Sequence, residues 1–296
     1  MLIGYLLHPL QTRKWLRYIE RTPALLDMAR ASPHLRGRLR RPYLTPRLSY
    51  ADRVDLLIGH YDILLHSPLA DWACKAAQQP VPLGEFIGKS GAVYQLTLAA
   101  TDAARRDGEL VLRLMSRDVC VYTAAFVFLR QDGERCVKLG GLQGLLATDK
   151  TMGIKQVTRD LYGCRPKELM VAVVREIGRL AGCGKLILIG NANKLPPREK
   201  HVCRKSADYD ATWEEMRALR RPDGDYELPC RAGGSPGAFE AGASRRTVVI
   251  ESLLDLVRLR FSQDRVTAAV RTASHAPPMP APPAVPRGTD IDNRTS

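Results

Sequence analysis

His60 and Tyr61 are adjacent residues late in a predicted helix, and both side chains can exchange protons. A single histidine in such a helix is commonly a hydrogen-bonded core residue, so catalysis and structural support both remain open for His60. Cys183, His201 and Cys203 carry groups that bind metals. No Cys-x-x-Cys pair accompanies them, so the sequence predicts no metal site.

A glycine-rich segment, Leu139-Gly-Gly-Leu-Gln-Gly144, follows a predicted strand. Glycine lets another backbone or a ligand approach a strand closely, and Gln143 offers an amide donor and acceptor. Because ligands often bind at strand ends beside a crossover connection, Gln143 and Gly144 are candidate ligand contacts. Tight packing of the strand end against the following helix would explain the same glycines.

Arg165 and Lys167 flank a proline at the start of a predicted helix. The N-terminus of a helix carries partial positive charge, so two cations there are unfavourable unless an anion lies close by. That anion could be a ligand phosphate or a carboxylate of the protein itself.

Basic residues are also concentrated near the N-terminus. The 296-residue chain has 45 Lys and Arg against 31 Asp and Glu, a formal net charge of +14, and residues 1–60 contain 11 of these basic and four of these acidic residues. The densest segment, Arg30–Arg47, includes Arg40 and Arg41, whose planar guanidinium groups suit phosphate. Anionic lipid head groups are one partner. Nucleic acid is less favoured, because the run from Arg36 to Arg41 has no interleaved aromatic residue. A solvated basic surface is the alternative.

Apolar periodicity predicts helices at both ends of the chain and strands between them. The expected helices cover Gln11–Arg30 with a break at Pro23, then Tyr50–Leu65, Leu69–Ala77, Arg165–Ala181, Tyr209–Arg217 and Arg245–Phe261. An antiparallel meander is expected between residues 93 and 142, and the apolar run Lys185–Gly190 is typical of a buried strand. The predicted fold class is α+β, with N-terminal helices followed by a mixed, mainly antiparallel sheet with a crossover helix.

These elements predict three regions: a basic helical region (1–80), an α+β core (81–265) and a disordered, proline-rich tail (266–296). No stretch approaches 18 consecutive apolar residues, so no transmembrane helix is expected. The seven cysteines lack regular spacing and the apolar run Leu2–Leu7 is too short for a signal-peptide core, so we expect a cytoplasmic protein. No P-loop, dinucleotide-binding glycine pattern or nucleophile elbow is present in the sequence.

Seven short motifs occur in order along residues 10–265. They are Pro33-His-Leu-Arg-Gly-Arg-Leu-Arg-Arg-Pro-Tyr43, His60-Tyr61, Gly141-Leu-Gln-Gly144, Thr158-Arg-Asp-Leu-Tyr-Gly-Cys-Arg-Pro-Lys167, His201-Val202, Tyr209-Asp-Ala-Thr-Trp213 and Leu228-Pro229. Together they resemble the VirK/YbjX family of bacterial proteins. Two segments depart from the family pattern: Leu195-Pro-Pro197 precedes His201, and Ala218-Leu-Arg-Arg221 replaces a Gly-Gly pair.

The resemblance implies a cytosolic protein of a Gram-negative bacterium. It also implies links to virulence, to surface display of an outer-membrane virulence factor, and to envelope changes that resist cationic antimicrobial peptides.

The predicted order of meander, glycine-rich strand end, long helix and buried strand is similar to the acyl-CoA-binding core of GNAT-type N-acyltransferases. On that analogy acyl-CoA would be the ligand, His60, Tyr61 and His201 the acid–base residues, and Arg165 and Lys167 the anion contacts.

Asn191, in the loop after the buried strand, is a further candidate ligand contact. Two other functions remain open. One is a non-enzymatic module that binds anionic membranes or nucleic acid through the N-terminal arginines, and the other is a chaperone-like partner of an envelope protein.

Overall fold

The computed structural model describes residues 7–40, 42–100, 106–144, 153–196, 208–230 and 245–274. Its helices are α2 (Pro9–Arg21), α3 (Pro23–Ala31), η1 (Pro33–Arg40), α4 (Tyr50–Leu65), α5 (Ala70–Gln78), α6 (Ile154–Asp160), α7 (Pro166–Leu180), η2 (Asn191–Asn193), α8 (Tyr209–Glu215) and α9 (Arg245–Ser274). Its strands are β1 (Val81–Ile87), β2 (Val93–Ala100), β3 (Leu110–Ser116), β4 (Val119–Gln131), β5 (Glu134–Gly144), β6 (Lys185–Leu188), β7 (Leu219–Arg220) and β8 (Tyr226–Pro229).

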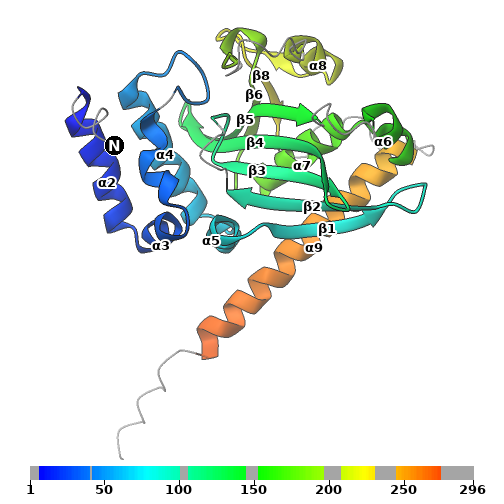
Figure 1. The fold of residues 1–296 in the computed structure, drawn as a ribbon, viewed down its shortest axis with the longest axis horizontal. Helices are drawn as coiled ribbons and strands as arrows, with labels where there is room; N and C mark the ends of the chain where they lie inside the picture. Colours follow the sequence, from blue (N-terminus) through cyan, green and yellow to red (C-terminus); the bar gives the residue numbers. More distant parts are fainter. Residues whose placement is uncertain are drawn as a thin grey trace, which may run out of the picture.

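The strands form one sheet in the order β1-β2-β3-β4-β5-β6-β8-β7. Neighbouring strands are antiparallel except β5 and β6, which are parallel because α7 crosses over between them. The α+β prediction is therefore confirmed. Figure 1 shows the N-terminal helices beside one end of the sheet, with α6 at the other end and α7 and α9 crossing behind it.

Several elements were not expected from the sequence. The strand β1 lies at one edge of the sheet, and the short β7–β8 hairpin lies at the other. The helix α6 follows β5 in the chain and precedes α7. The last helix, α9, continues to Ser274, well beyond the expected end at Phe261.

A proline and a capping box determine where the N-terminal helices begin and end. Pro23 separates α2 from α3, since its ring cannot continue the preceding helix. A capping box starts α4: the Ser49 hydroxyl accepts the Asp52 N–H, and the Asp52 carboxylate accepts the Ser49 N–H. α4 packs on β4 and α5 on β2, so this helical region covers one end of the sheet.

The long helix α9 joins several parts of the fold. It packs on β1 and α7 and buries Leu253, Val257 and Phe261. Arg258 donates to Glu176 of α7 over 2.8 Å, and the Trp72 indole of α5 donates to Asp264 over 2.9 Å. The final helix is therefore attached both to the sheet and to the N-terminal helices.

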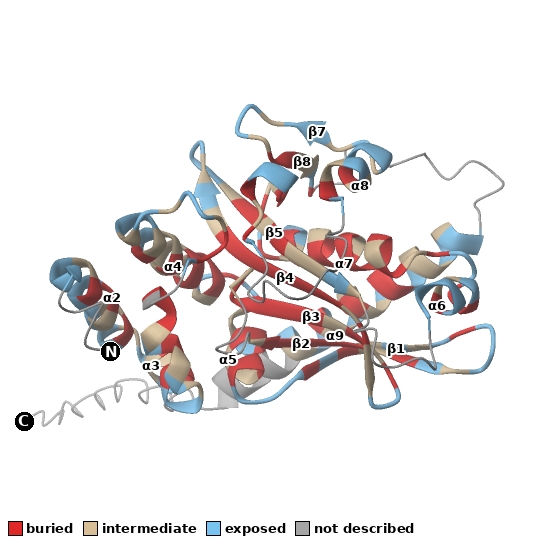
Figure 2. Cartoon of the chain, turned by 45° about the horizontal axis from the view of Figure 1, so that its top comes forward, coloured by how far each residue is buried: buried red, intermediate tan, exposed pale blue. Residues whose placement is uncertain are grey.

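One large cluster of buried hydrophobic residues runs through the described structure and includes side chains from the N-terminal helices, the sheet, α7 and α9. Figure 2 shows buried residues along the central strands and α7, with exposed residues on the outer helices and hairpin tips. The central sheet is thus closely packed on its neighbours, which favours precise placement of residues at its strand ends.

Candidate anion pocket at the end of β5

The two parallel strands separate toward the C-terminal end of β5. β6 pairs only with Cys136–Leu139, so the last five residues of β5 run on without it. A pocket of about 430 Å³ lies at this end of the sheet, between β4, α6 and the start of α7. Its lining residues are Tyr122, Ile154, Lys155, Thr158, Arg159, Arg165, Pro166 and Lys167. We call this hollow the α7 pocket.

Gly144 gives the α7 pocket part of its space. A Cβ atom at Gly144 would lie 3.0 Å from the Tyr122 ring and 3.3 Å from Ile154, so a larger residue would press on two lining side chains. The candidate residues Gly144, Arg165 and Lys167 therefore meet at one place. Gln143 lies beside this group with an exposed side chain, and its backbone carbonyl accepts the Thr123 hydroxyl over 3.4 Å.

Carboxylates of the protein partner the two basic residues at the start of α7. Arg165 donates to Glu168 and to Glu215 of α8, each over 2.7 Å, and Lys167 donates to Glu215 over 3.3 Å. These hydrogen bonds, first from Arg165 and then from Lys167, hold the pKa of Glu215 below its usual range. The carboxylate alternative considered for this helix start is thus realised in the structure.

Lys155 and Arg159 add further positive charge to the pocket from α6. Both side chains are exposed and, among the described residues, neither makes an ion pair. They are four residues apart and so lie on one face of the helix. The α7 pocket combines two cations shared with Glu215 and two that are available to an added anion.

The open edge of β5 is bonded to a tyrosine of α8. The Tyr209 hydroxyl accepts the Leu142 N–H over 2.8 Å and donates to the Leu142 carbonyl over 3.0 Å. Burial raises the pKa of Tyr209 to about 12, so the hydroxyl stays protonated near neutral pH. One side chain thereby occupies both backbone groups where a neighbouring strand would otherwise pair.

Asn191 positions α8 and is not among the residues that line the α7 pocket. Its side-chain oxygen accepts the Tyr209 N–H over 3.0 Å, and its amide donates to Asp208 over 2.8 Å. Asp208 in turn accepts the Ala211 N–H and caps the helix. Asn191 thus supports Tyr209 from the loop that follows β6.

The other glycines of the segment serve packing. A Cβ at Gly140 would collide with the backbone carbonyl of Asp107, and one at Gly141 would lie 2.9 Å from the Asp107 side chain. Tight packing was the alternative explanation for these glycines. The structure supports it for Gly140 and Gly141, with the segment before β3 as the neighbour instead of the following helix.

His60 and Tyr61 lie at the opposite end of the sheet. His60 is fully buried, its Nδ1 accepts the Phe128 N–H over 3.0 Å, and burial lowers its pKa to about 4. The Tyr61 hydroxyl donates to Glu109 over 2.8 Å, and Arg38 donates to the same carboxylate over 2.6 Å. Neither candidate lines the α7 pocket. We call Arg38, Glu109 and Tyr61 the buried ionic cluster.

The structure divides the N-terminal arginines. Arg38 is 8% exposed and paired inside the protein, and Arg30 donates to Asp27 over 2.7 Å at the surface. Arg36 and Arg47 are exposed. Arg40 is the last residue of η1. The candidates Arg41 and His201 lie outside the described residues.

Sequence reasoning missed four residues of this region: Tyr122, Lys155, Arg159 and Tyr209. The spacing of Lys155 and Arg159 was readable, but the seven-residue α6 lacks a long periodic pattern. Tyr209 occurs in a family motif, yet its bond to Leu142 joins residues 67 positions apart. No group of three or more metal-binding side chains occurs in the described part of the chain.

We compared the sequence and the structure with those of known proteins to find the family of this chain. The E. coli K12 protein named "Uncharacterized protein YbjX" is 24% identical over 235 residues, which cover 78% of this chain and 71% of that protein. Among solved structures, a mutant of the cAMP-binding acyltransferase from Mycobacterium smegmatis matches 73% of this chain with 9% identity and a TM-score of 0.31. The match spans 63% of that protein, less than two thirds of its length, and a TM-score this low supports no inference about function.

None of the described helices is long and apolar enough to cross a bilayer.

The model of the family DUF535, described as "Protein of unknown function", matches residues 1–234 of the 296. The YbjX-like motifs, the identity to YbjX and this match agree, and the chain belongs to the DUF535 family, which corresponds to the VirK/YbjX family.

Proposed function

We propose that the protein is an acyltransferase that binds acyl-CoA at the α7 pocket. The observation that carries this proposal is the position of Lys155, Arg159, Arg165 and Lys167 around one pocket, beyond the carboxyl end of a parallel strand and at the N-terminus of a 15-residue helix. Both features favour phosphate, because helix N-terminal N–H groups and the helix dipole attract anions and ligands collect at such strand ends.

The phosphates of coenzyme A would occupy the pocket in this proposal. They would contact Lys155 and Arg159 directly and compete with Glu215 for Arg165 and Lys167. The charges fit a polyanion better than a single carboxylate, since four cations surround the space.

The thioester arm would follow the open edge of β5. The arm would displace the Tyr209 hydroxyl, which now bonds to both backbone groups of Leu142, and would so release this hydroxyl for proton transfer. In acyl transfer an acceptor amine or hydroxyl attacks the thioester carbonyl and loses its proton, the carbon–sulfur bond breaks, and the leaving thiolate takes a proton from a donor. The acceptor's proton then returns to that donor, which is unchanged after each cycle. A protonated Tyr209 hydroxyl beside this edge is the residue we propose as that proton donor. The buried His60 and Tyr61 have no part in this scheme.

A titration with acetyl-CoA and a long-chain acyl-CoA tests the binding step. We expect micromolar to millimolar binding, and the double variant Lys155→Glu/Lys167→Glu should weaken it by more than about tenfold, because it reverses two charges at the pocket. The matched control Arg36→Glu/Arg47→Glu makes the same charge change at exposed positions of the N-terminal region. Absence of binding by the folded wild-type protein, or equal loss in both variants, would refute the proposal.

The cellular role that we propose follows the family resemblance: acyl transfer in the cytoplasm of a Gram-negative bacterium that alters its envelope during virulence. A gene deletion should increase sensitivity to cationic antimicrobial peptides. The wild-type gene should restore resistance and the Lys155→Glu/Lys167→Glu gene should not. Equal restoration by both genes would separate any such role from the α7 pocket.

A further inference from the structure

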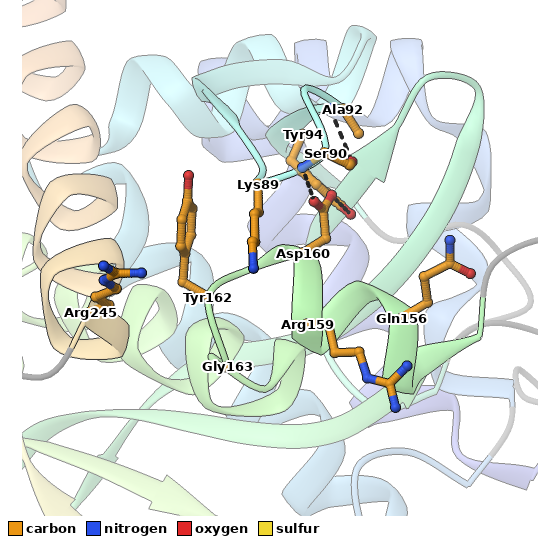
Figure 3. A pocket seen from close by; sticks show the side chains of 10 residues that line it. All are labelled: Lys89, Ser90, Ala92, Tyr94, Gln156, Arg159, Asp160, Tyr162, Gly163 and Arg245. Carbon is orange, nitrogen blue, oxygen red and sulfur yellow. Dashed lines mark hydrogen bonds between the residues drawn. The ribbon is translucent and has the colours of Figure 1, made fainter.

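A second and larger hollow, of about 720 Å³, lies on the other side of α6. Figure 3 shows its lining residues, which come from the turn between β1 and β2, the start of β2, α6 and the turn after it, and the first residue of α9. We call it the α6–α9 hollow. It shares Arg159 with the α7 pocket and otherwise has its own residues.

The α6–α9 hollow has an excess of positive charge. Lys89, Arg159 and Arg245 come from three different elements, all three are exposed, and among the described residues none makes an ion pair. Figure 3 shows Lys89 and Arg245 on the two sides of Tyr162. Three separate elements therefore place cations along the rim of the hollow, with Arg159 pointing away from the other two (Figure 3), and none has an acidic partner among the described residues.

The only carboxylate among the lining residues, Asp160, is already occupied. It accepts the Ser90 N–H over 2.5 Å and the Tyr94 hydroxyl over 2.8 Å. Burial by itself would raise the pKa of Asp160, but these hydrogen bonds hold it below its usual range. Asp160 therefore connects α6 to the β1–β2 turn and the start of β2 through its hydrogen bonds, and it forms no ion pair with the three cations among the described residues.

An apolar crevice of about 180 Å³ adjoins the hollow and shares Tyr162 with it. The crevice lies between the end of β1, the turn after α6 and the first turns of α9, and its walls include Phe86, Leu161, Leu253 and Leu256. The backbone of Tyr162 adopts a left-handed conformation, with φ of 55°, which is uncommon for a residue with a side chain.

Apolar side chains remain exposed at the rim of this crevice. Ile87 is 67% exposed, Val248 is 51% exposed and Tyr162 is 40% exposed. A single exposed apolar residue is ordinary. Three around one crevice, beside cations that make no ion pair with a described residue, form a combined apolar and basic surface.

We propose that the α6–α9 hollow and its crevice bind an anionic phospholipid at a membrane surface. Head-group phosphates lie along the rim that carries Lys89, Arg159 and Arg245, and the first part of an acyl chain enters the crevice beside it. Ile87 and Val248 then contact the interfacial region of the bilayer. A free phosphate would use the cations but leave the crevice empty, so the pairing of charge with apolar surface favours lipid. This inference does not depend on acyl-CoA binding.

Vesicle flotation tests the proposal with the full-length protein. The protein should float with vesicles of phosphatidylcholine plus phosphatidylglycerol, much less with phosphatidylcholine alone, and less at high salt, because screening weakens surface attraction. Lys89→Glu/Arg245→Glu should reduce the partition coefficient by more than about tenfold. Arg36→Glu/Arg47→Glu, with the same net charge change, should float like the wild type.

Two further measurements separate lipid from its alternatives. Val248→Asp should reduce flotation without changing the thermal unfolding midpoint by more than a degree or so, since Val248 is half exposed. Short-chain phosphatidylglycerol should bind more tightly than glycerol 3-phosphate. Three results would overturn the proposal. Equal affinity for the two compounds would indicate a simple phosphate site, and loss of flotation in the Arg36→Glu/Arg47→Glu variant would assign binding to the N-terminal arginines. No flotation of the wild-type protein would refute lipid binding.

Discussion

The two ends of the sheet use charged residues in opposite ways. In the buried ionic cluster, Arg38 and Glu109 are nearly inaccessible, and the carboxylate is bonded to both Arg38 and Tyr61. Around α6, by contrast, Lys89, Lys155 and Arg159 are exposed and make no ion pair within the described residues. A buried charge is stable only beside a fixed partner of opposite charge, whereas an exposed charge is solvated by water and remains accessible to a ligand. The first end should therefore determine stability and the second should determine binding.

Removing one partner of the buried ionic cluster should have the largest effect. Arg38→Met leaves the Glu109 carboxylate buried without its cation, and we expect the free energy of unfolding to fall by about 3–5 kcal/mol. Urea denaturation measures it. The double variant Arg38→Met/Glu109→Leu should recover most of the loss, since no unpaired charge remains. A loss below about 1 kcal/mol in the single variant would contradict the contrast between the two ends.

His60 should make stability depend on mildly acidic pH. Its pKa is lowered to about 4 by burial, while an unfolded histidine titrates near 6.5. As the pH falls through about 6.5 the unfolded chain gains a proton that the native protein does not, so stability decreases by about 1.4 kcal/mol for each pH unit until the pH approaches 4. Urea denaturation across this range should show that slope, and His60→Gln should lack it. An unchanged slope in the variant would show that other groups cause the dependence.

The Tyr209 hydroxyl connects structure and proposed chemistry, so its removal should have an intermediate effect. Tyr209→Phe leaves the Leu142 N–H without its partner and should cost about 1–2 kcal/mol of stability. If acyl transfer is detected, the same variant should lower kcat more than it raises KM. Tyr162→Phe, at an exposed tyrosine, is the control for stability and should change nothing measurable. A neutral Tyr209→Phe variant would remove its assigned role at the β5 edge.

The smallest stability effects should come from the exposed cations Lys89 and Lys155. Lys89→Met and Lys155→Met should each change the free energy of unfolding by less than about 0.5 kcal/mol, because each side chain is exposed and has no ion pair with a described residue. Chemical denaturation of the two variants beside wild type checks this. A loss above about 1 kcal/mol would show that these residues support the fold, and it would weaken both binding proposals.

Local sequence signals predicted much of the scaffold. Pro166 and the apolar spacing of the next fifteen residues indicated α7, and the apolar run at Lys185 indicated β6. Short elements such as the two-residue β7 were missed, because their sequences are too brief for a periodic pattern.

The site was less predictable because its contacts join distant residues. Arg38 meets Glu109 across 71 positions, and Arg165 meets Glu215 across 50. The sequence predicted correctly that Arg165 lies at a helix start. It could not show whether Arg165 pairs with a carboxylate or binds a ligand, because that depends on the positions of Glu215 and Lys155 in the structure. His60 illustrates the same limit, since its burial depends on Phe128 in a strand it does not adjoin in sequence.

The attachment of α9 has a consequence for how the protein opens. The family match ends at residue 234, before α9 begins, yet α9 is bonded to Trp72 of α5 and to Glu176 of α7. Detaching α9 must break contacts with the N-terminal helices and with the sheet together. The rates of amide hydrogen exchange in α5 and in residues 245–265 should therefore change together. A chain shortened after residue 234 should be more susceptible to proteolysis and aggregation, because β1 and α7 lose the apolar residues of α9 that cover them.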